Sequence, residues 1–351
     1  MSPTAGRVGI RDVAAAAGVS VTTTSDALNG RGRVEAGTRE RVLAAAADLG
    51  YRANVHARML RRGRSGVLGI MSSLAADASM NLAGIEYLAD ILSAAATTGL
   101  SRGYAIVLLP PSPGDERPDG GVEIDGVLLL DPVAGSTLAE RLERDGVPTV
   151  SSGRMPGRPP GDATWVDNDI PAATEMVLDL LWERGARRVA LVTNPPIPSY
   201  AVDTLAEYER WSAAHGVEPL VVQTAELATE SSAFHATDPL LADPARRPDA
   251  IYAPLDRLAA GAMLAARRHG LSVPEDLLVA SGVDSQATRL ATPPVTAVEL
   301  HAPEIGRRAL ELLIDRVEGR RDGPRQVVVD ATLHERASTL PHAAARRASV
   351  K

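Results

Sequence analysis

A twenty-residue stretch near the N-terminus, IRDVAAAAGVSVTTTSDALN over 10–29, constrains this chain most strongly. It predicts two short helices, Ile10–Ala17 and Val21–Leu28, separated by a tight turn. Gly18 can adopt the left-handed backbone conformation that ends the first helix, and Ser20 is a good N-cap for the second. This arrangement favours a helix-turn-helix, whose second helix enters the DNA major groove. The alternative is an αα-hairpin of another kind, because short motifs of this type also occur by chance.

The next segment, TRERVLAAAADLG over 38–50, predicts a third helix with Thr38 as its N-cap and Gly50 at its end. Its apolar residues recur at helical spacing and should cover the first two helices. These residues are Val42, Leu43, Ala46 and Leu49. The three helices together predict a small all-α head.

The loop before the third helix is rich in glycine and arginine. Arg33 is predicted to contact a phosphate or a base from this loop. A minor-groove hook made of Arg31, Gly32 and Arg33 is the disfavoured alternative, because Val34 follows where such hooks carry proline.

A second arginine-rich segment, YRANVHARMLRRGRSG, follows over 51–66. Asn54 can cap a short helix that runs to about Arg62. One interpretation is a charged linker between domains. The other is a hinge helix that becomes ordered on DNA, with Leu60 as an apolar wedge in the minor groove and Ala57 small enough for close approach.

The charge of the chain is divided unevenly. Residues 1–64 contain eleven Arg and five Asp or Glu, a net charge of +6, whereas the whole chain has a net charge of −7. A basic head on an acidic body indicates that the head meets a polyanion, although an ordinary solvated basic face would give the same count.

The composition also bears on the compartment. The chain has no cysteine, which excludes disulfides and cysteine-based metal sites and fits a reducing environment. The sequence has no apolar run long enough to span a membrane, and its start lacks the apolar core of a signal peptide. The sequence therefore predicts a cytoplasmic protein.

Residues 8–70 resemble the LacI (lactose repressor) family of bacterial regulators. The matching segments are IRDVAAAAGVS, LNG at 28–30, TRERVL, LGYRAN, ARML and GVLGIM. The resemblance implies a transcriptional regulator, in particular a repressor, that binds a pseudo-palindromic operator as a homodimer. It places Val21 and Thr22 where the family reads bases, and Ser25 and Asn29 at a phosphate or base. The predicted DNA-binding residues are Ile10, Arg11, Val21, Thr22, Thr23, Ser25, Asp26, Asn29, Arg33, Thr38, Asn54, Ala57, Arg58 and Leu60.

Two residues of the head depart from the family pattern. Asp26 stands where the family usually has an arginine that can grip guanine, whereas a carboxylate only accepts, for instance from cytosine N4. Either Asp26 turns away and bonds Arg11 or Arg33, which is the favoured alternative, or the operator differs from the family's usual one. Ala53 replaces a usual proline, which loosens the entry to the hinge helix.

In the body, apolar runs alternate with helical runs, which predicts parallel sheets with helices on both faces. Strands are predicted at 67–71, 104–109, 126–130, 148–151, 165–166, 189–193, 220–223, 250–252, 278–280, 327–329 and 332–333. Helices are predicted at 81–101, 135–145, 170–184, 205–215, 257–269 and 303–318. The length indicates two α/β lobes with a changeover near 160–170.

The body resembles the periplasmic-binding-protein-like effector domain of the same family. Matching segments include RRVALV at 187–192, RPDAIYA at 247–253, GLSVPEDL at 270–277 and ATPPVTAVE at 291–299. The predicted organisation is a helix-turn-helix domain over 1–53, a hinge helix and linker over 54–65, a two-lobed effector-binding and dimerisation domain over 66–340, and a disordered tail over 341–351.

Ligands in open α/β sheets bind beyond the carboxyl ends of the strands, here in the cleft between the lobes. Asp131 is one candidate at such a strand end, and Trp165 would offer a stacking surface. For each aspartate the alternative is a helix cap, especially for Asp167 and Asp256. The predicted effector-binding residues are Arg154, Trp165, Asp167, Asp203, Thr204, Asp256 and Asp284.

Three positions depart from the family's sugar-binding pattern. The segment SYAVDTLAEY lacks its usual arginine, Gly153 stands at an acidic position, and Val283 replaces an aspartate. Because buried sugar hydroxyls must be paired, an ordinary hexose is disfavoured. The effector is therefore an unusual ligand, less hydroxylated or cationic, or one displaced within the cleft, or there is none.

Nothing in the sequence indicates catalysis. The seven histidines are scattered, and GxSxG, P-loop and GxGxxG motifs are absent. We therefore predict no enzyme activity, no metal and no cofactor. Besides an effector-controlled regulator, two alternatives are open: a small-molecule binding protein with a vestigial head, and a DNA-binding regulator that needs no effector.

Overall fold

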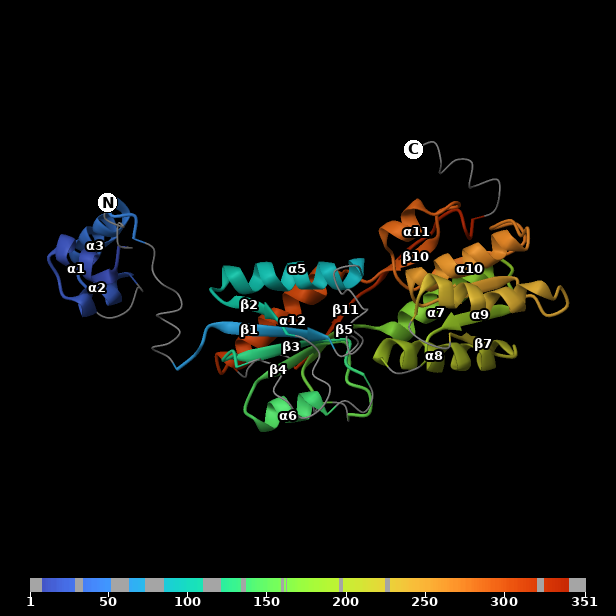
Figure 1. The fold of residues 1–351 in the computed structure, drawn as a ribbon, viewed down its shortest axis with the longest axis horizontal. Coiled ribbons are helices and arrows are strands. Elements are labelled where there is room, and N and C mark those ends of the chain that lie inside the picture. The colour runs from blue at the N-terminus through green and yellow to red at the C-terminus, as the bar shows by residue number, and fades with distance from the viewer. Residues whose placement is uncertain are drawn as a thin grey trace. The chain divides into compact units, whose positions relative to one another are not determined.

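The computed structural model describes residues 8–28, 34–51, 63–72, 85–109, 121–133, 137–158, 161, 163–195, 198–224, 228–320 and 325–340. The chain divides into two compact units, residues 1–65 and residues 66–351 (Figure 1). We call them the head and the body.

The head contains the three predicted helices, α1 (Ile10–Ala17), α2 (Val21–Leu28) and α3 (Ala36–Asp48). Gly18 ends α1 with a φ of 66°. The Ser20 Oγ accepts a hydrogen bond from the N–H of Thr23 at 3.0 Å, so Ser20 caps α2 as predicted. A small core joins the helices and consists of Val13, Ala17, Ala27, Val42 and Ala46.

Two predictions about α3 are wrong. The helix begins at Ala36, so Thr38 lies inside its first turn rather than at the N-cap and accepts a hydrogen bond from Arg41. Leu43 and Leu49 are exposed. Only Val42 and Ala46, four residues apart, share the face that packs on the other helices, because one further residue turns a side chain by about 100°.

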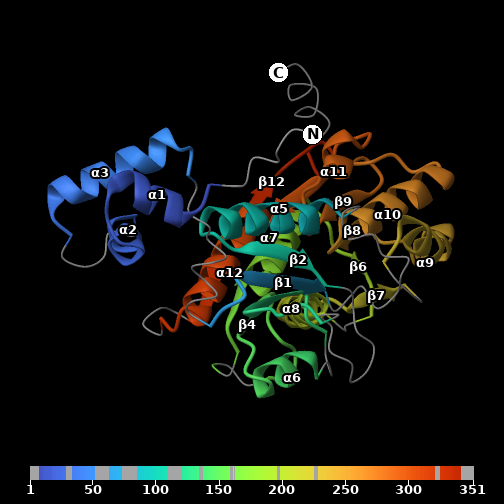
Figure 2. The same ribbon diagram turned by 60° about the vertical axis from the view of Figure 1, so that its left-hand side comes forward.

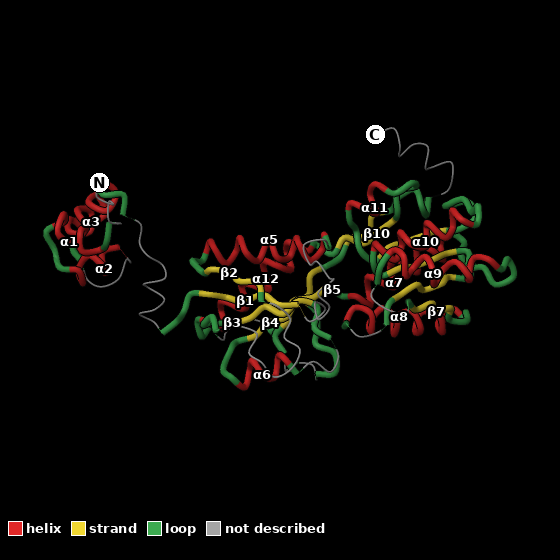
Figure 3. Tube along the Cα trace, viewed as in Figure 1, coloured by secondary structure: helices red, strands yellow, loops and turns green. Residues whose placement is uncertain are grey.

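The body has two six-stranded sheets, each in its own lobe (Figure 3). The N-lobe sheet has the strand order β11-β5-β4-β3-β1-β2 and the C-lobe sheet the order β12-β10-β9-β8-β6-β7. All neighbours are parallel except β10 and β12, which are antiparallel. This confirms the predicted two-lobed α/β architecture.

The N-lobe elements are β1 (Val67–Ser72), α5 (Glu86–Ser101), β2 (Ala105–Leu108), β3 (Gly126–Leu130), α6 (Leu138–Arg144), β4 (Thr149–Ser152), β5 (Trp165–Asn168), α12 (Ala302–Val317) and β11 (Gln326–Val329). The C-lobe elements are α7 (Ile170–Glu183), β6 (Val189–Thr193), α8 (Ser199–His215), β7 (Leu220–Gln223), α9 (Glu230–Ala242), β8 (Ala250–Ala253), α10 (Asp256–Arg268), β9 (Leu278–Ser281), α11 (Gln286–Leu290), β10 (Thr296–Glu299) and β12 (Thr332–His334).

The chain crosses between the lobes three times, after β5, after β10 and after β11. The single changeover predicted near 160–170 is therefore only the first crossing. The second brings α12 back to the N lobe, where it packs beside α5 (Figure 2). A Cβ at Gly306 of α12 would lie 2.3 Å from the carbonyl oxygen of Ile91, so this close approach requires glycine.

Each sheet carries helices on both faces. In the C lobe, one core contains Leu178, Tyr208 and Trp211 under α7 and α8, and the other contains Leu258 and Ala262 under α9 and α10. Because both faces are covered, central strands can be apolar throughout, as in β3, whose five residues are all apolar and buried.

Candidate functional site

The recognition helix α2 has one buried face and one open face. Thr24 and Ala27 are buried against the rest of the head. Val21 is 42% exposed and Thr22 is also exposed. With Ser25 and Asp26 they occupy one continuous side of the helix, as positions i, i+1, i+4 and i+5 do. The first turn of a recognition helix is the part that reaches base edges, so this side is suited to reading DNA.

The favoured alternative for Asp26, a bond to Arg11 or Arg33, is tested only for Arg11. Among the described residues, no hydrogen bond or ion pair joins Asp26 to Arg11, and Arg33 lies outside them. Asp26 is half-buried and shares the open side of α2 with Val21 and Thr22. A bond to Arg33 and an operator that differs from the family's usual one therefore both stay open.

The remaining predicted DNA-binding residues divide into two groups. Ile10 and Thr23 are half-buried and Arg11 is exposed at the start of α1. Thr38, in α3, is also half-buried. The other six lie outside the described residues, together with the whole predicted hinge helix. They are Asn29, Arg33, Asn54, Ala57, Arg58 and Leu60.

A cavity lies between the lobes of the body, at the carboxyl ends of β3, β5, β8 and β9. Residues of both lobes line it, and ligand sites occur preferentially at such interfaces. The N lobe contributes Tyr87, Asp131 and Asp167. The C lobe contributes Ile170, Ala173, Thr174, Ser199, Tyr200, Thr204, Tyr252, Pro254, Leu255, Gly282, Val283 and Leu300.

Two carboxylates face this cavity. Burial, and then the nearby Asp167 carboxylate, raise the pKa of Asp131 to about 7, against the attraction of Arg257. Burial raises the pKa of Asp167 to about 6, although its carboxylate accepts backbone N–H bonds from Arg154 and Asn168, both at 2.8 Å. The cavity therefore contains two buried carboxyl groups whose ionisation is disfavoured.

Three tyrosines also line the cavity, and the sequence did not single them out. Burial raises the pKa of Tyr87, with a further contribution from the two aspartates, and burial raises the pKa of Tyr252 to about 12. The Tyr200 hydroxyl donates to Asn194 Oδ1 at 3.2 Å. All three are neutral donors at physiological pH.

The structure divides the seven predicted effector-binding residues into three sets. Asp167 and Thr204 line the cavity. Arg154 and Asp203 form an ion pair with each other, which joins the N lobe to α8 of the C lobe. Trp165, Asp256 and Asp284 do not line the cavity.

The local structure explains why Trp165 and Asp256 do not line the cavity. Trp165 begins β5, and the cavity lies at the other end of that strand. Asp256 accepts the N–H of Arg257 in the first turn of α10 and lines a separate hollow of the C lobe. The carboxylate of Asp167, in contrast, does not cap α7, because the N-cap is Asp169.

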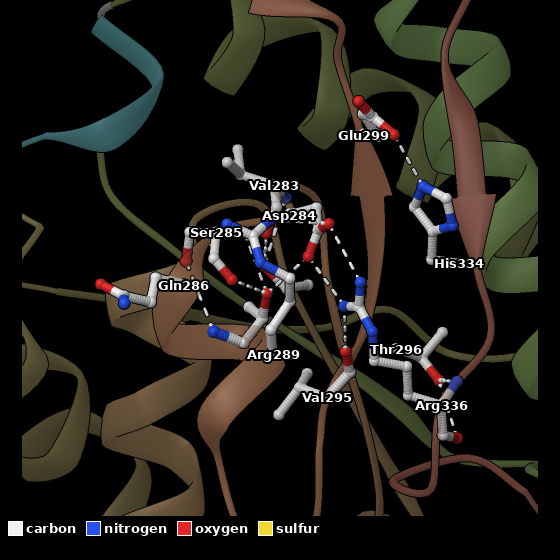
Figure 4. A network of polar contacts seen from close by, with 12 residues as sticks. Val283, Asp284, Ser285, Gln286, Arg289, Val295, Thr296, Glu299, His334 and Arg336 are labelled. Atoms are coloured by element: carbon white, nitrogen blue, oxygen red, sulfur yellow. Dashed lines mark hydrogen bonds and ion pairs between the residues drawn. The ribbon is translucent and has the colours of Figure 1, made fainter. Parts of the chain in front are cut away.

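Asp284 belongs to a polar network of the C lobe, shown in Figure 4. Its two carboxylate oxygens accept from Arg336 at 2.7 and 3.0 Å, and also from Thr288 and Arg289 at 2.8 and 3.1 Å. Burial alone would raise its pKa, yet the hydrogen bonds from Arg336 and Thr288 hold the pKa below its ordinary value. The predicted effector role of Asp284 is thus replaced by a structural one.

The same network reaches the other lobe. Glu86, at the start of α5, accepts from the backbone N–H of Gln286 and from Arg289, both at 2.6 Å. Together with the ion pair of Arg154 and Asp203, this contact bridges the two lobes. The lobes are therefore held together by side chains as well as by the crossing strands.

Two absences concern only the described part of the chain. It contains no group of three or more histidine, aspartate or glutamate side chains that could hold a metal ion. It also contains no helix whose length and hydropathy would suffice to cross a bilayer.

Two family models match this sequence. The model for bacterial regulatory proteins of the lacI family matches residues 9–54, and the model for a periplasmic binding protein-like domain matches residues 178–339. The chain is also 32% identical to the HTH-type transcriptional regulator CelR of Thermobifida fusca over 333 residues, which cover 93% of this chain and 96% of that protein.

Solved structures have the same fold. The complex of the transcriptional regulator CelR with cellobiose has a TM-score of 0.69 and 29% identity, and the match covers 95% of this chain and 100% of that chain. The lac repressor dimer bound to operator and the anti-inducer ONPF has a TM-score of 0.76 at 23% identity, with 95% and 99% covered. These structures contain the same combination of head and two-lobed body.

Proposed function

Since the chain belongs to the LacI family and is a transcriptional regulator, we propose that it is a repressor. We propose that it binds a pseudo-palindromic operator as a homodimer. A small molecule in the cavity between the lobes modulates its DNA affinity. It acts in the cytoplasm, where its DNA target lies, and has no enzyme activity; its relatives are regulators.

The observation that carries this proposal is the open side of α2. Val21 and Thr22 are exposed in its first turn, while the opposite side is fixed to α1 and α3 by buried residues. A rigid helix with exposed, uncharged side chains at its N-terminal end can contact base edges, whereas the arginines of the head supply phosphate contacts.

The experiment is a fluorescence anisotropy titration of the full chain with DNA from upstream of its own gene and of neighbouring genes. At about 100–150 mM salt, non-specific binding is weak, so specific sites should stand out. We expect one or more fragments to bind at least about a thousandfold more tightly than scrambled DNA of the same composition. Equal affinity for all fragments would refute sequence-specific regulation.

Dimerisation is supported by apolar side chains that the single chain leaves uncovered. Leu290 on α11 is 73% exposed, and Leu100 on α5 is 66% exposed. Leu290 lines a hollow of the C lobe with Met263 and Leu264. The helices α5 and α11 lie along the same side of the body in Figures 1 and 2, and Glu86 and Arg289 link them. A second copy on this side would bury Leu100, Leu290 and the hollow.

Replacing Leu290 by glutamate is expected to raise the dimer dissociation constant on the order of a hundredfold, because a two-fold interface contains each substitution twice. Analytical ultracentrifugation measures the change. Met176→Glu on α7 is the control, since Met176 is also partly exposed but belongs to another helix. If L290E leaves the dimer intact, the interface lies elsewhere.

For the effector we propose population shift between two lobe arrangements. Such a ligand must bind the two arrangements with different affinities. The bridges from Arg154 to Asp203 and from Glu86 to Arg289 would break or form in that change. The predicted hinge helix, with Leu60 in the minor groove, would transmit it to the DNA.

A further inference from the structure

The described lining of the interlobe cavity has acidic side chains but no basic ones. It includes the carboxylates of Asp131 and Asp167 and contains no arginine, lysine or histidine. The guanidinium of Arg154, which attracts Asp167, is bonded to Asp203. Arg257 attracts Asp131 at a distance but does not line the cavity.

The two carboxyl groups of the cavity differ in their hydrogen bonding. Asp167 is 7% exposed, and its carboxylate already accepts two backbone N–H groups. Within the described residues, no hydrogen bond or ion pair reaches the carboxylate of Asp131. At pH 8, above the pKa of about 7, the Asp131 carboxylate is ionised and only accepts hydrogen bonds, so it favours a ligand that donates.

The walls around the two carboxylates are aromatic. Tyr87, Tyr200 and Tyr252 all line the cavity, from α5, α8 and β8. An ammonium group is attracted to the face of an aromatic ring, and more strongly where water is excluded. Serine and threonine hydroxyls also line the cavity and can donate to or accept from the rest of such a ligand.

We propose that the cavity takes a small organic cation, an amine or quaternary ammonium compound, whose charged nitrogen lies between Asp131 and Asp167 and against the tyrosine rings. This inference rests on the proposed effector function and specifies its chemical class. It follows from the two carboxyl groups, the absence of a cationic side chain from the described lining, and the aromatic walls together.

The titration of the pair agrees with this assignment. A negative charge on either aspartate makes ionisation of the other less favourable. A bound cation would favour the ionised form of both. The charged or titratable groups near Asp131 are Asp167 on β5, Tyr87 on α5, Tyr200 on α8 and Arg257 on α10. Because the pKa of Asp131 is about 7, cation affinity should fall as the pH drops from 8 to 6.

The test is isothermal titration calorimetry of the full chain at pH 8 with two cations and two neutral analogues of similar shape. The cations are putrescine and choline, and the analogues are butanediol and dimethylbutanol. Cellobiose serves as a neutral sugar. We expect at least one cation to bind about tenfold or more tightly than its analogue.

Asp131→Asn should reduce the affinity for that cation by about tenfold or more, since it removes one charge and keeps the volume. Asn also tolerates the left-handed backbone of residue 131, where φ is 43°. Without ligand, the melting temperature of this variant at pH 8 should equal or exceed that of the wild type. Asp256→Asn, outside the cavity, is the matched control and should leave cation affinity unchanged.

The outcomes separate this inference from the proposed function. Binding of cellobiose without binding of either cation would overturn the cationic class and leave the effector cavity in place. Absence of all binding would overturn the inference, and the operator titration would still decide the function of the head. An unchanged cation affinity in D131N would equally refute the placement at Asp131.

Discussion

Replacing Val21 and Thr22 together by alanine should lower the affinity for the specific operator about a hundredfold or more. A base contact contributes roughly 1–3 kcal/mol of discrimination, and these are the two exposed residues in the first turn of α2. The affinity for non-specific DNA should change little, because the arginines that meet phosphates are untouched. Anisotropy titrations with operator and scrambled DNA measure both affinities.

The control for this variant is Leu43→Ala, which removes an exposed apolar side chain from α3 instead. Circular dichroism should show an unchanged helical content and melting temperature in both proteins, since none of the three side chains belongs to the core of the head. Equal operator affinity of the double variant and the wild type would mean that α2 does not read the bases.

Replacing Asp284 by alanine should lower the free energy of unfolding by about 3–5 kcal/mol, the range for removing one partner of a buried ion pair. The Asp284 side chain is 7% exposed, and the loss would leave Arg336, which is 18% exposed, without its carboxylate. Arg289 would also lose one of its two partners. Urea denaturation of the body followed by tryptophan fluorescence measures the change.

Glu218→Ala is the matched control, because Glu218 is an exposed acidic residue of the same lobe. It should change the free energy of unfolding by less than about 0.5 kcal/mol. Similar values for both variants would show that the network around Asp284 contributes no net stability.

The pH dependence of this network has a definite sign. The folded pKa of Asp284 lies below its ordinary value of 3.8. Its contribution is therefore fully present above that value and is lost as the pH falls through the lower, folded pKa. The stability difference between the wild type and Asp284→Asn should accordingly be constant near neutral pH and shrink only below pH 3.8.

The head was predictable because its signals are local. Gly18 and Ser20 specify the turn between α1 and α2 through their own backbone and side chain, so both helices have the predicted bounds. The start of α3 was misplaced because Glu35 occupies the N-cap without a side-chain bond, and no sequence signal marks that position.

In the body, apolar runs identified most strands, but three elements were missed. α9 contains Pro239 and many small polar residues, α11 has five residues, and β10 follows a proline-rich turn. The lobe crossings depend on pairings between distant segments, such as β11 with β5, which no local pattern encodes.

The sequence predicted the location of the cavity but only some of the residues that line it. Strand ends indicated Asp131 and Asp167 correctly as cavity residues, whereas Trp165 starts its strand and faces away from that end. The tyrosines were missed because Tyr87 and Tyr200 lie in the first turns of helices, and Tyr200 belongs to an α8 that begins six residues before its predicted start.

The three lobe crossings have a consequence for the order in which this protein is made. The N lobe is complete only when α12 and β11, residues 302–329, have been synthesised. The head, in contrast, has its own core and lies within the first 65 residues. Since domains fold as units during synthesis, a nascent chain displays a folded head long before it has a finished N lobe. A truncated product that ends near residue 300 would therefore carry the DNA-contacting unit without the α5–α12 pair.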